Sequence, residues 1–201
     1  MITTFFFDIG NVLIGFDHHP IWQRLAAMSP LSTGELEQRI KASAFMDLHE
    51  IGQLPPREFF RAMQTLGQLD PALSFDEFCL IWTDIFWENK PMMQLAQTLR
   101  RQYALFLISN VGEIHWNWLA QHYPIFSQVA DPILSFQVGY MKPAKEIYQE
   151  ALLRAGALPE QCVYIDDVAE YVAASREIGI QGIQYQSLGQ VKSALNQLGV
   201  C

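Results

Sequence analysis

The sequence has few cysteines and few basic residues. Its three cysteines, Cys79, Cys162 and Cys201, show no paired metal-ligand spacing, and their odd number does not suggest a disulfide framework. Lys and Arg number 13 against 21 Asp and Glu, so the formal net charge is -8. This charge opposes the broad electrostatic attraction that nucleic acid or an anionic membrane surface needs. We therefore expect no nucleic-acid or membrane partner, and a cytoplasmic location.

The sequence also lacks the signature of a leader or membrane anchor at its N-terminus. The apolar stretch there has no basic flank, and Asp8 interrupts it. At 50% hydrophobic residues, a chain of 201 residues can bury a full core as one domain with a small inserted module. We expect a globular protein, and the sequence leaves its oligomeric state open between monomer and homodimer.

Three short segments are apolar, rich in β-branched or aromatic residues, and without polar alternation, which is typical of strands buried on both faces. Each of them ends at polar side chains. The segments are Ile2–Phe7, followed by Asp8; Tyr103–Ile108, followed by Ser109 and Asn110; and Cys162–Ile165, followed by Asp166 and Asp167.

Helical periodicity occupies the intervals between these strands and after the last. The alternation predicts an α/β fold with a doubly wound, Rossmann-like parallel sheet. Ligands of such sheets bind outside the carboxyl ends of the strands, so the three polar clusters should converge on one site. The predicted helices are Pro91–Gln102, Glu113–His122, Ala144–Ala155 and Ala169–Ile178.

Between about Asp17 and Lys90 the strand pattern disappears, and prolines separate several short helical stretches. We therefore predict a Rossmann-like core of residues 1–15 and 91–201 with an all-helical cap, residues 16–90, inserted after the first strand. Trp82, Phe86 and Trp87 lie near helical spacing, and we expect them to pack in the core or at the cap hinge.

The polar residues at the strand ends suggest a phosphate site with a metal. A phosphate monoester is a dianion, which an unshielded carboxylate would repel. A hard cation such as Mg²⁺ can bridge Asp8 and the phosphate while Asp166 and Asp167 anchor it, with Asp167 the preferred direct ligand. Asp8 can then attack phosphorus and form an aspartyl phosphate.

Three further residues fit the same site. Lys142 can neutralise charge on Asp8 and on the transferring group. The hydroxyl of Ser109 and the backbone N–H of Asn110 can donate to phosphate oxygens. Each feature alone has an ordinary alternative, because a lysine is usually a solvated surface residue and Ser-Asn can be a helix N-cap.

At these residues the sequence resembles the haloacid dehalogenase (HAD) superfamily. The resemblance implies a small helical cap, a magnesium cofactor and roles for the matched residues as given above. Within the superfamily the chain is most similar to bacterial sugar-phosphatase-like members, including those acting on glucose 1-phosphate, which implies a small phosphorylated metabolite as substrate. The four matching motifs are Phe7–Leu13, Ile108–Asn110, Lys142 and Ile165–Asp167.

One position departs from that pattern. Most phosphatases of the superfamily carry a second Asp two residues after the nucleophile as general acid and base, whereas this chain has Gly10, whose backbone carbonyl can still bind the metal. Losing a general acid or base costs roughly two to four decades in rate. Water, a good leaving group or a cap residue could substitute for the missing acid. Phe45–Gly52 resembles a substrate-facing cap helix, although a plain amphipathic helix is the more ordinary interpretation. The candidates are Asp17, His18, His49 and Glu50.

Gly10 also keeps two alternative functions open. A 2-haloacid dehalogenase uses the same attacking Asp on carbon, without a metal and without the second Asp, but the acidic pair Asp166 and Asp167 makes better sense with a cation. A protein that only binds a phosphorylated ligand would gain from removing the anionic Asp8. Both alternatives are weaker than the phosphatase.

Overall fold

The computed structural model describes residues 1–129 and 131–200, and a five-stranded parallel sheet organises them. The strand order is β5-β4-β1-β6-β7, so the chain winds in both directions from the central strand β1. The predicted α/β, doubly wound parallel fold is confirmed. The strands are β1 (Thr4–Phe7), β4 (Ala104–Ser109), β5 (Ile133–Leu134), β6 (Cys162–Asp166) and β7 (Gln181–Gln184).

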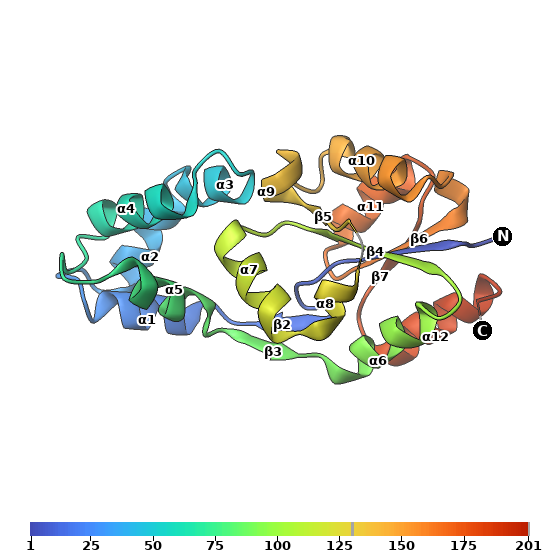
Figure 1. Cartoon of the computed structure of the whole chain (residues 1–201), viewed down its shortest axis with the longest axis horizontal. Coiled ribbons are helices and arrows are strands. Elements are labelled where there is room, and N and C mark those ends of the chain that lie inside the picture. Colours follow the sequence, from blue (N-terminus) through green and yellow to red (C-terminus); the bar gives the residue numbers. More distant parts are fainter. Residues whose placement is uncertain (130, 201) are drawn as a thin grey trace.

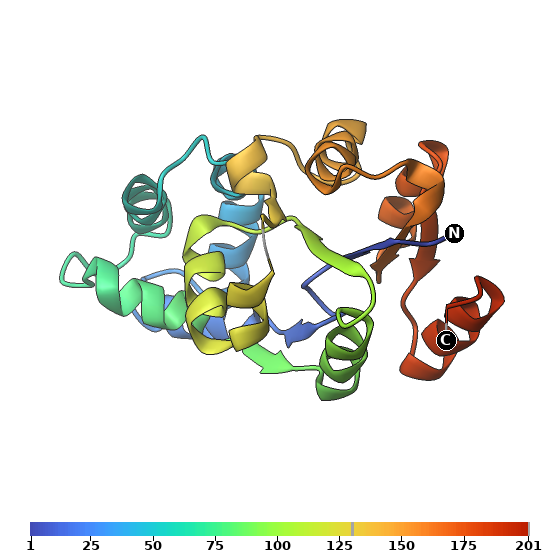
Figure 2. The same cartoon turned by 45° about the vertical axis from the view of Figure 1, so that its right-hand side comes forward.

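Helices cover both faces of the sheet, as the apolar run of β1 requires. Phe5 and Phe7 pack into one hydrophobic cluster and Phe6 into another on the opposite face, and all three are fully buried. Figures 1 and 2 show the helices on either side. One face carries α6 (Lys90–Leu99), α7 (Glu113–His122), α8 (Pro124–Gln128) and α12 (Leu188–Gln197); the other carries α10 (Lys145–Ala155) and α11 (Ala169–Glu177), and the short α9 (Ser135–Val138) follows β5.

The sheet is wider than the three strands that the sequence predicts. Those three form its centre, and β5 and β7 extend it at the two edges. β7 has the sequence Gln-Gly-Ile-Gln, with only Ile183 buried, so it lacks the apolar run of a central strand. β5 is only two residues long. Edge strands of this kind carry too little hydrophobic pattern to be recognised.

A third hydrophobic cluster belongs mainly to the helices inserted between β2 (Ile14–Phe16) and β3 (Phe86–Glu88), which we call the cap. Two of them, α2 and α5, begin with capping boxes, Ser32 with Glu35 and Ser74 with Glu77. The cap lies at the end of the molecule opposite to both chain termini (Figure 1). Within the described residues, no helix is both long and apolar enough to cross a membrane. The cap helices are α1 (His19–Ala26), α2 (Thr33–Lys41), α3 (Phe45–Glu50), α4 (Pro56–Leu66) and α5 (Phe75–Thr83).

A short antiparallel ribbon joins the cap to the core. It pairs β2 (Ile14–Phe16) with β3 (Phe86–Glu88), so the expectation that the strand pattern disappears between Asp17 and Lys90 is wrong at β3. Phe86 and Trp87 lie on this strand rather than on a helix. The Trp87 indole covers Gly15 so closely that a Cβ there would overlap it. The ribbon is three residues long, too short for its alternation to stand out.

Candidate active site

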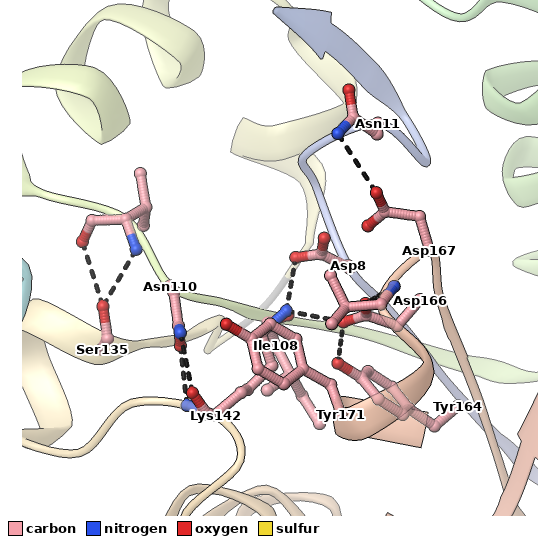
Figure 3. Close-up of polar contacts among 12 residues, drawn as sticks. Asp8, Asn11, Ile108, Asn110, Ser135, Lys142, Tyr164, Asp166, Asp167 and Tyr171 are labelled. Atoms are coloured by element: carbon pink, nitrogen blue, oxygen red, sulfur yellow. Dashed lines mark hydrogen bonds and ion pairs between the residues drawn. The ribbon is translucent and has the colours of Figure 1, made fainter. Parts of the chain in front are cut away.

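The polar residues that follow the three central strands converge at one edge of the sheet. β1 lies between β4 and β6, and the backbone N–H of Asp8 donates to the carbonyl of Ile165 at 2.9 Å. Oxygen atoms of Asp8, Asp166 and Asp167 lie within 4.8 Å of one another (Figure 3). The parallel register therefore gathers three carboxylates that are far apart in the sequence.

Lys142 lies between two of these carboxylates. Its Nζ is 2.8 Å from Oδ1 of Asp8 and 2.7 Å from Oδ2 of Asp166 (Figure 3). All three side chains are buried, Asp166 completely. A buried cation paired with two carboxylates compensates charges that would be costly in isolation. The lysine is a buried member of the cluster and not a solvated surface residue.

The protonation of this cluster follows from burial and mutual attraction. Burial raises the pKa of Asp8 to about 6, although Lys142 acts in the opposite direction. Burial alone would lower the pKa of Lys142, but the attraction of Asp8 and Asp166 outweighs it and raises that pKa. One cation thus faces three carboxylates, and the site is short of positive charge.

Asn110 positions Lys142, a role that the sequence does not reveal. Its side-chain Oδ1 accepts from the backbone N–H of Lys142 at 2.8 Å, and its Nδ2 donates to the Lys142 carbonyl at 3.0 Å. The Tyr171 ring centroid lies 5.0 Å from the Lys142 Nζ. The sequence predicts only a backbone contact from Asn110 to phosphate. The paired side-chain bonds depend on a loop geometry with no local sequence signal.

The two neighbouring aspartates differ in their partners. Oδ2 of Asp166 binds Lys142 and accepts a short hydrogen bond from the Tyr164 hydroxyl, while its Oδ1 accepts from the backbone N–H of Val168 at 2.8 Å. Asp167 is only partly buried, and its Oδ2 accepts from Asn11 at 3.1 Å. Burial raises the pKa of Asp167, and Asn11 opposes the rise. Asp167 therefore has the more available carboxylate.

This set of donors fits a hard divalent cation. Carboxylate oxygens at close mutual distance are the ligands that Mg²⁺ prefers, and a cation there would balance the excess negative charge. Direct ligation by Asp167 stays a prediction, which its freer carboxylate favours.

A cavity of about 110 Å³ lies beside the carboxylates. Ser109 and Asn110 form part of its wall on the core side, and His18 and Glu50 on the cap side. The side chains and backbone around it include Gly10, Phe16, His18, Glu50, Ser109, Asn110 and His115. A larger groove of about 540 Å³, mostly apolar, lies between α5 and α7, but none of the predicted catalytic or metal-binding residues lines it.

The other two cap candidates have structural partners instead. Oδ1 of Asp17 accepts from the backbone N–H of His19 at 2.9 Å, in a turn at the start of α1. His49 is buried, stacks on Phe59 with ring centroids 4.3 Å apart, and places its Nδ1 2.9 Å from the Leu54 carbonyl. Neither of them lines the cavity beside the carboxylates.

A family model described as haloacid dehalogenase-like hydrolase matches residues 2–179. The chain belongs to this family. The resemblance seen in the four motifs is thereby confirmed, and this HAD-like hydrolase is an enzyme by family membership.

Two comparisons place the HAD-like hydrolase among its relatives. It is 26% identical over 198 residues to D-ribitol-5-phosphate phosphatase of Bacteroides thetaiotaomicron, with 92% of each chain covered. A crystal structure of a HAD family enzyme from the same organism, in complex with magnesium and inorganic phosphate, superposes with a TM-score of 0.83 at 22% identity, covering 92% of this chain and 95% of the other.

A dehalogenase shares the fold less closely. The structure of a 2-haloacid dehalogenase from Pseudomonas syringae pv. Tomato DC3000 superposes with a TM-score of 0.69 at 20% identity, covering 98% of this chain and all of the other, 100%. At this level of identity the likeness shows the fold alone.

Proposed function

We propose that this HAD-like hydrolase is a magnesium-dependent phosphatase that hydrolyses a small phosphomonoester, a sugar or sugar-alcohol phosphate, through an aspartyl-phosphate intermediate on Asp8. The observation that carries the proposal is the charge balance of the site. Three carboxylates converge on a single buried lysine, which is a poor arrangement for holding a phosphate dianion unless a metal joins it.

The carboxylates of Asp8, Asp166 and Asp167 and the backbone carbonyl of Gly10 would hold Mg²⁺. When bound, the cation supplies positive charge between the Asp8 carboxylate and the phosphate. Asp167 has the carboxylate with fewer protein partners, and Asp166 is fixed by Lys142, Tyr164 and the Val168 N–H.

The chain's own residues perform the transfer. Lys142 binds one carboxylate oxygen of Asp8 and so fixes the orientation of the nucleophile, which attacks phosphorus. The Ser109 hydroxyl and the backbone N–H of Asn110 donate to the phosphate oxygens, and Lys142 neutralises part of the developing charge. Water then attacks phosphorus, which releases phosphate and restores Asp8.

The relatives support the substrate class. The D-ribitol-5-phosphate phosphatase is matched over nearly its full length, and it acts on a phosphorylated polyol. The structural neighbour with magnesium and phosphate has the same fold at a high TM-score. We therefore place a polyol or sugar on the leaving-group side of the cavity.

The experiment is phosphate release from sugar phosphates, sugar-alcohol phosphates and an aryl phosphate, with Mg²⁺ and with a chelator. The proposal expects release that needs Mg²⁺ and is absent in Asp8→Asn. Metal-independent halide release from 2-haloacids by the wild type would instead establish the dehalogenase, which Gly10 and the shared fold allow. Phosphate binding without any turnover on the panel would point to the phospholigand-binding alternative.

A further inference from the structure

The structure shows why position 10 carries no side chain. A Cβ built on Gly10 would lie 2.9 Å from Cε1 of Phe16. Phe16 lines the cavity together with Gly10, so its ring occupies the space that a longer side chain at position 10 would need. An acid at position 10 would require the ring to move. A side chain that donates a proton to the leaving group would therefore come from another part of the cavity wall.

Three titratable side chains line the cavity besides the backbone of Gly10: His18, Glu50 and His115. His115 stacks on Trp82 with centroids 5.5 Å apart and places its Nε2 3.0 Å from the Trp82 carbonyl, and burial lowers its pKa to about 3. Burial, assisted by Lys41, also lowers the pKa of His18. Both imidazoles are neutral at physiological pH and are poor proton donors.

Burial shifts the pKa of Glu50 in the opposite direction, upward. This glutamate is the last residue of α3, and burial raises the pKa of its carboxyl to about 7, with Asp47 adding to the rise and Lys142 opposing it. A carboxyl with a pKa near 7 is present in both its protonated and its ionised form at neutral pH, which suits a group that acts first as general acid and then as general base.

Close backbone approaches hold this end of α3 against the core. Gly52 has a φ of +73°, and a Cβ there would overlap the carbonyl of Phe136 in α9. A Cβ on Gly112, at the start of α7, would lie 2.6 Å from Nε2 of His49. Figure 1 shows α3 beside α9. Glu50 lies between His49 and Gly52, so its backbone is held against the core while the residue lines the cavity.

We propose that Glu50, from cap helix α3, is the catalytic general acid and base of this enzyme, in place of the side chain absent at Gly10. The assignment rests on the proposed phosphatase function. In the first step the bond between phosphorus and Oδ of Asp8 forms, the bond to the leaving oxygen breaks, and Glu50 gives its proton to that oxygen. In the second step the Glu50 carboxylate takes a proton from the water that attacks phosphorus, and phosphate and the Asp8 carboxylate are released.

The test compares Glu50→Gln with the wild type on two substrates that differ in leaving group. A sugar-alcohol phosphate leaves as an alkoxide that needs a proton, whereas an aryl phosphate leaves as a stable phenolate. We expect kcat/KM to fall by about 10²–10³-fold on the sugar-alcohol phosphate and by less than about tenfold on the aryl phosphate. Glu58→Gln, which neutralises an exposed acid on the neighbouring cap helix α4, is the control and should change neither value by more than a few fold.

The pH profile gives a second readout that a merely structural role would not move. For the sugar-alcohol phosphate, wild-type kcat/KM should fall as pH rises through the pKa of Glu50, near 7, because the acid is then ionised. The variant should lack this limb. The groups that set this pKa or face the carboxyl are Asp47, Lys142, Tyr171, His18 and His115.

Equal losses on both substrates, with the alkaline limb retained, would overturn the role of Glu50 while leaving the phosphatase standing. Absence of Mg²⁺-dependent release from the aryl phosphate by the wild type would overturn the phosphatase, and the assignment with it. Thermal unfolding of the variant shows whether a loss reflects misfolding.

A second experiment tests whether an acid at position 10 can replace Glu50 once the Phe16 ring is removed. Gly10→Asp combined with Phe16→Ala supplies an acid at position 10 and the room for it. In the Glu50→Gln background this pair should raise kcat/KM on the sugar-alcohol phosphate at least tenfold, and in the wild-type background it should raise it much less. Equal effects in both backgrounds would show that Glu50 and an acid at position 10 do not share one role.

Discussion

The two sides of the active site differ in how they are built. The side formed by the core, which we call the core wall, contains Asp8, Lys142 and Asp166, which are buried, charged and joined by ion pairs of 2.7 and 2.8 Å. The opposite side, which we call the cap wall, contains Phe16, His18 and Glu50; burial lowers the pKa of His18 and raises that of Glu50 to about 7, so it favours the neutral form of both groups. Under the proposed function, the core wall would carry the phosphoryl chemistry and the cap wall would act on the leaving group.

The largest expected effect is a loss of activity when the nucleophile in the core wall is replaced. Asp8→Asn should lower kcat by roughly 10⁴-fold or more, because the amide keeps the shape of the carboxylate but is a poor nucleophile. Steady-state phosphate release measures the loss, and circular dichroism checks that the fold is kept. Residual activity within tenfold of the wild type would contradict covalent catalysis at Asp8.

Removing the cation of the core wall should destabilise the fold as well as slow the reaction. Lys142→Ala leaves Asp8 and Asp166 as buried carboxylates without their shared partner, so we expect the free energy of unfolding to fall by about 3–5 kcal/mol in metal-free buffer. Urea denaturation provides the measurement. The exposed Lys145→Ala is the control, and equal stability of the two variants would show that the buried pairs contribute nothing.

Ionisation of Glu50 in the cap wall should make the free energy of unfolding depend on pH. The pKa of Glu50 is higher in the folded protein, about 7, than its usual 4.5, so the folded state binds this proton more tightly. Stability is then lost as pH rises from about 4.5 to about 7, by on the order of 3 kcal/mol. Glu50→Gln cannot ionise. Its unfolding free energy relative to the wild type should therefore increase over this range.

Urea denaturation of both proteins at several pH values in a chelating buffer tests the sign and the size of this effect. A stability difference that stays constant with pH would mean that Glu50 is already ionised in the folded state.

A smaller effect should follow from loosening the acidic pair. Asn11 has a φ of 52° and donates to Asp167 at 3.1 Å, so Asn11→Gly removes the hydrogen bond while keeping a residue that tolerates this backbone. We expect the affinity for Mg²⁺ to weaken by roughly 10–100-fold, as for other partners of metal ligands. Calorimetric titration with Mg²⁺ measures it, and unchanged affinity would argue against Asp167 as a ligand.

The same contrast explains what the sequence could predict. The core wall follows from buried apolar runs that end in polar residues, and parallel pairing fixes where those ends meet, so Asp8, Ser109 and Asp166 could be placed together in advance. The edge strands β5 and β7 could not be predicted because their short or polar sequences carry no such pattern.

The cap wall could not be predicted in this way. Asp17, His18, His49 and Glu50 are equally plausible from the sequence, and only the packing of the cap on the core separates them. His49 stacks on Phe59 and Asp17 caps a turn, whereas His18 and Glu50 reach the cavity. The position of the Phe16 ring over Gly10 likewise depends on the antiparallel ribbon of β2 and β3, and the local sequence does not reveal it.

The most direct test of the account is to look for the phosphoryl group on Asp8 itself. The enzyme would be mixed with a sugar-alcohol phosphate and Mg²⁺, quenched in acid during turnover, digested, and its peptides analysed by mass spectrometry. Covalent catalysis at Asp8 predicts that a fraction of the peptide containing Asp8 carries one added phosphoryl group. This group should be absent from Asp8→Asn and more abundant when hydrolysis of the intermediate is slowed. Turnover at full rate with no phosphoryl group on that peptide, or with the group on another residue, would contradict this mechanism.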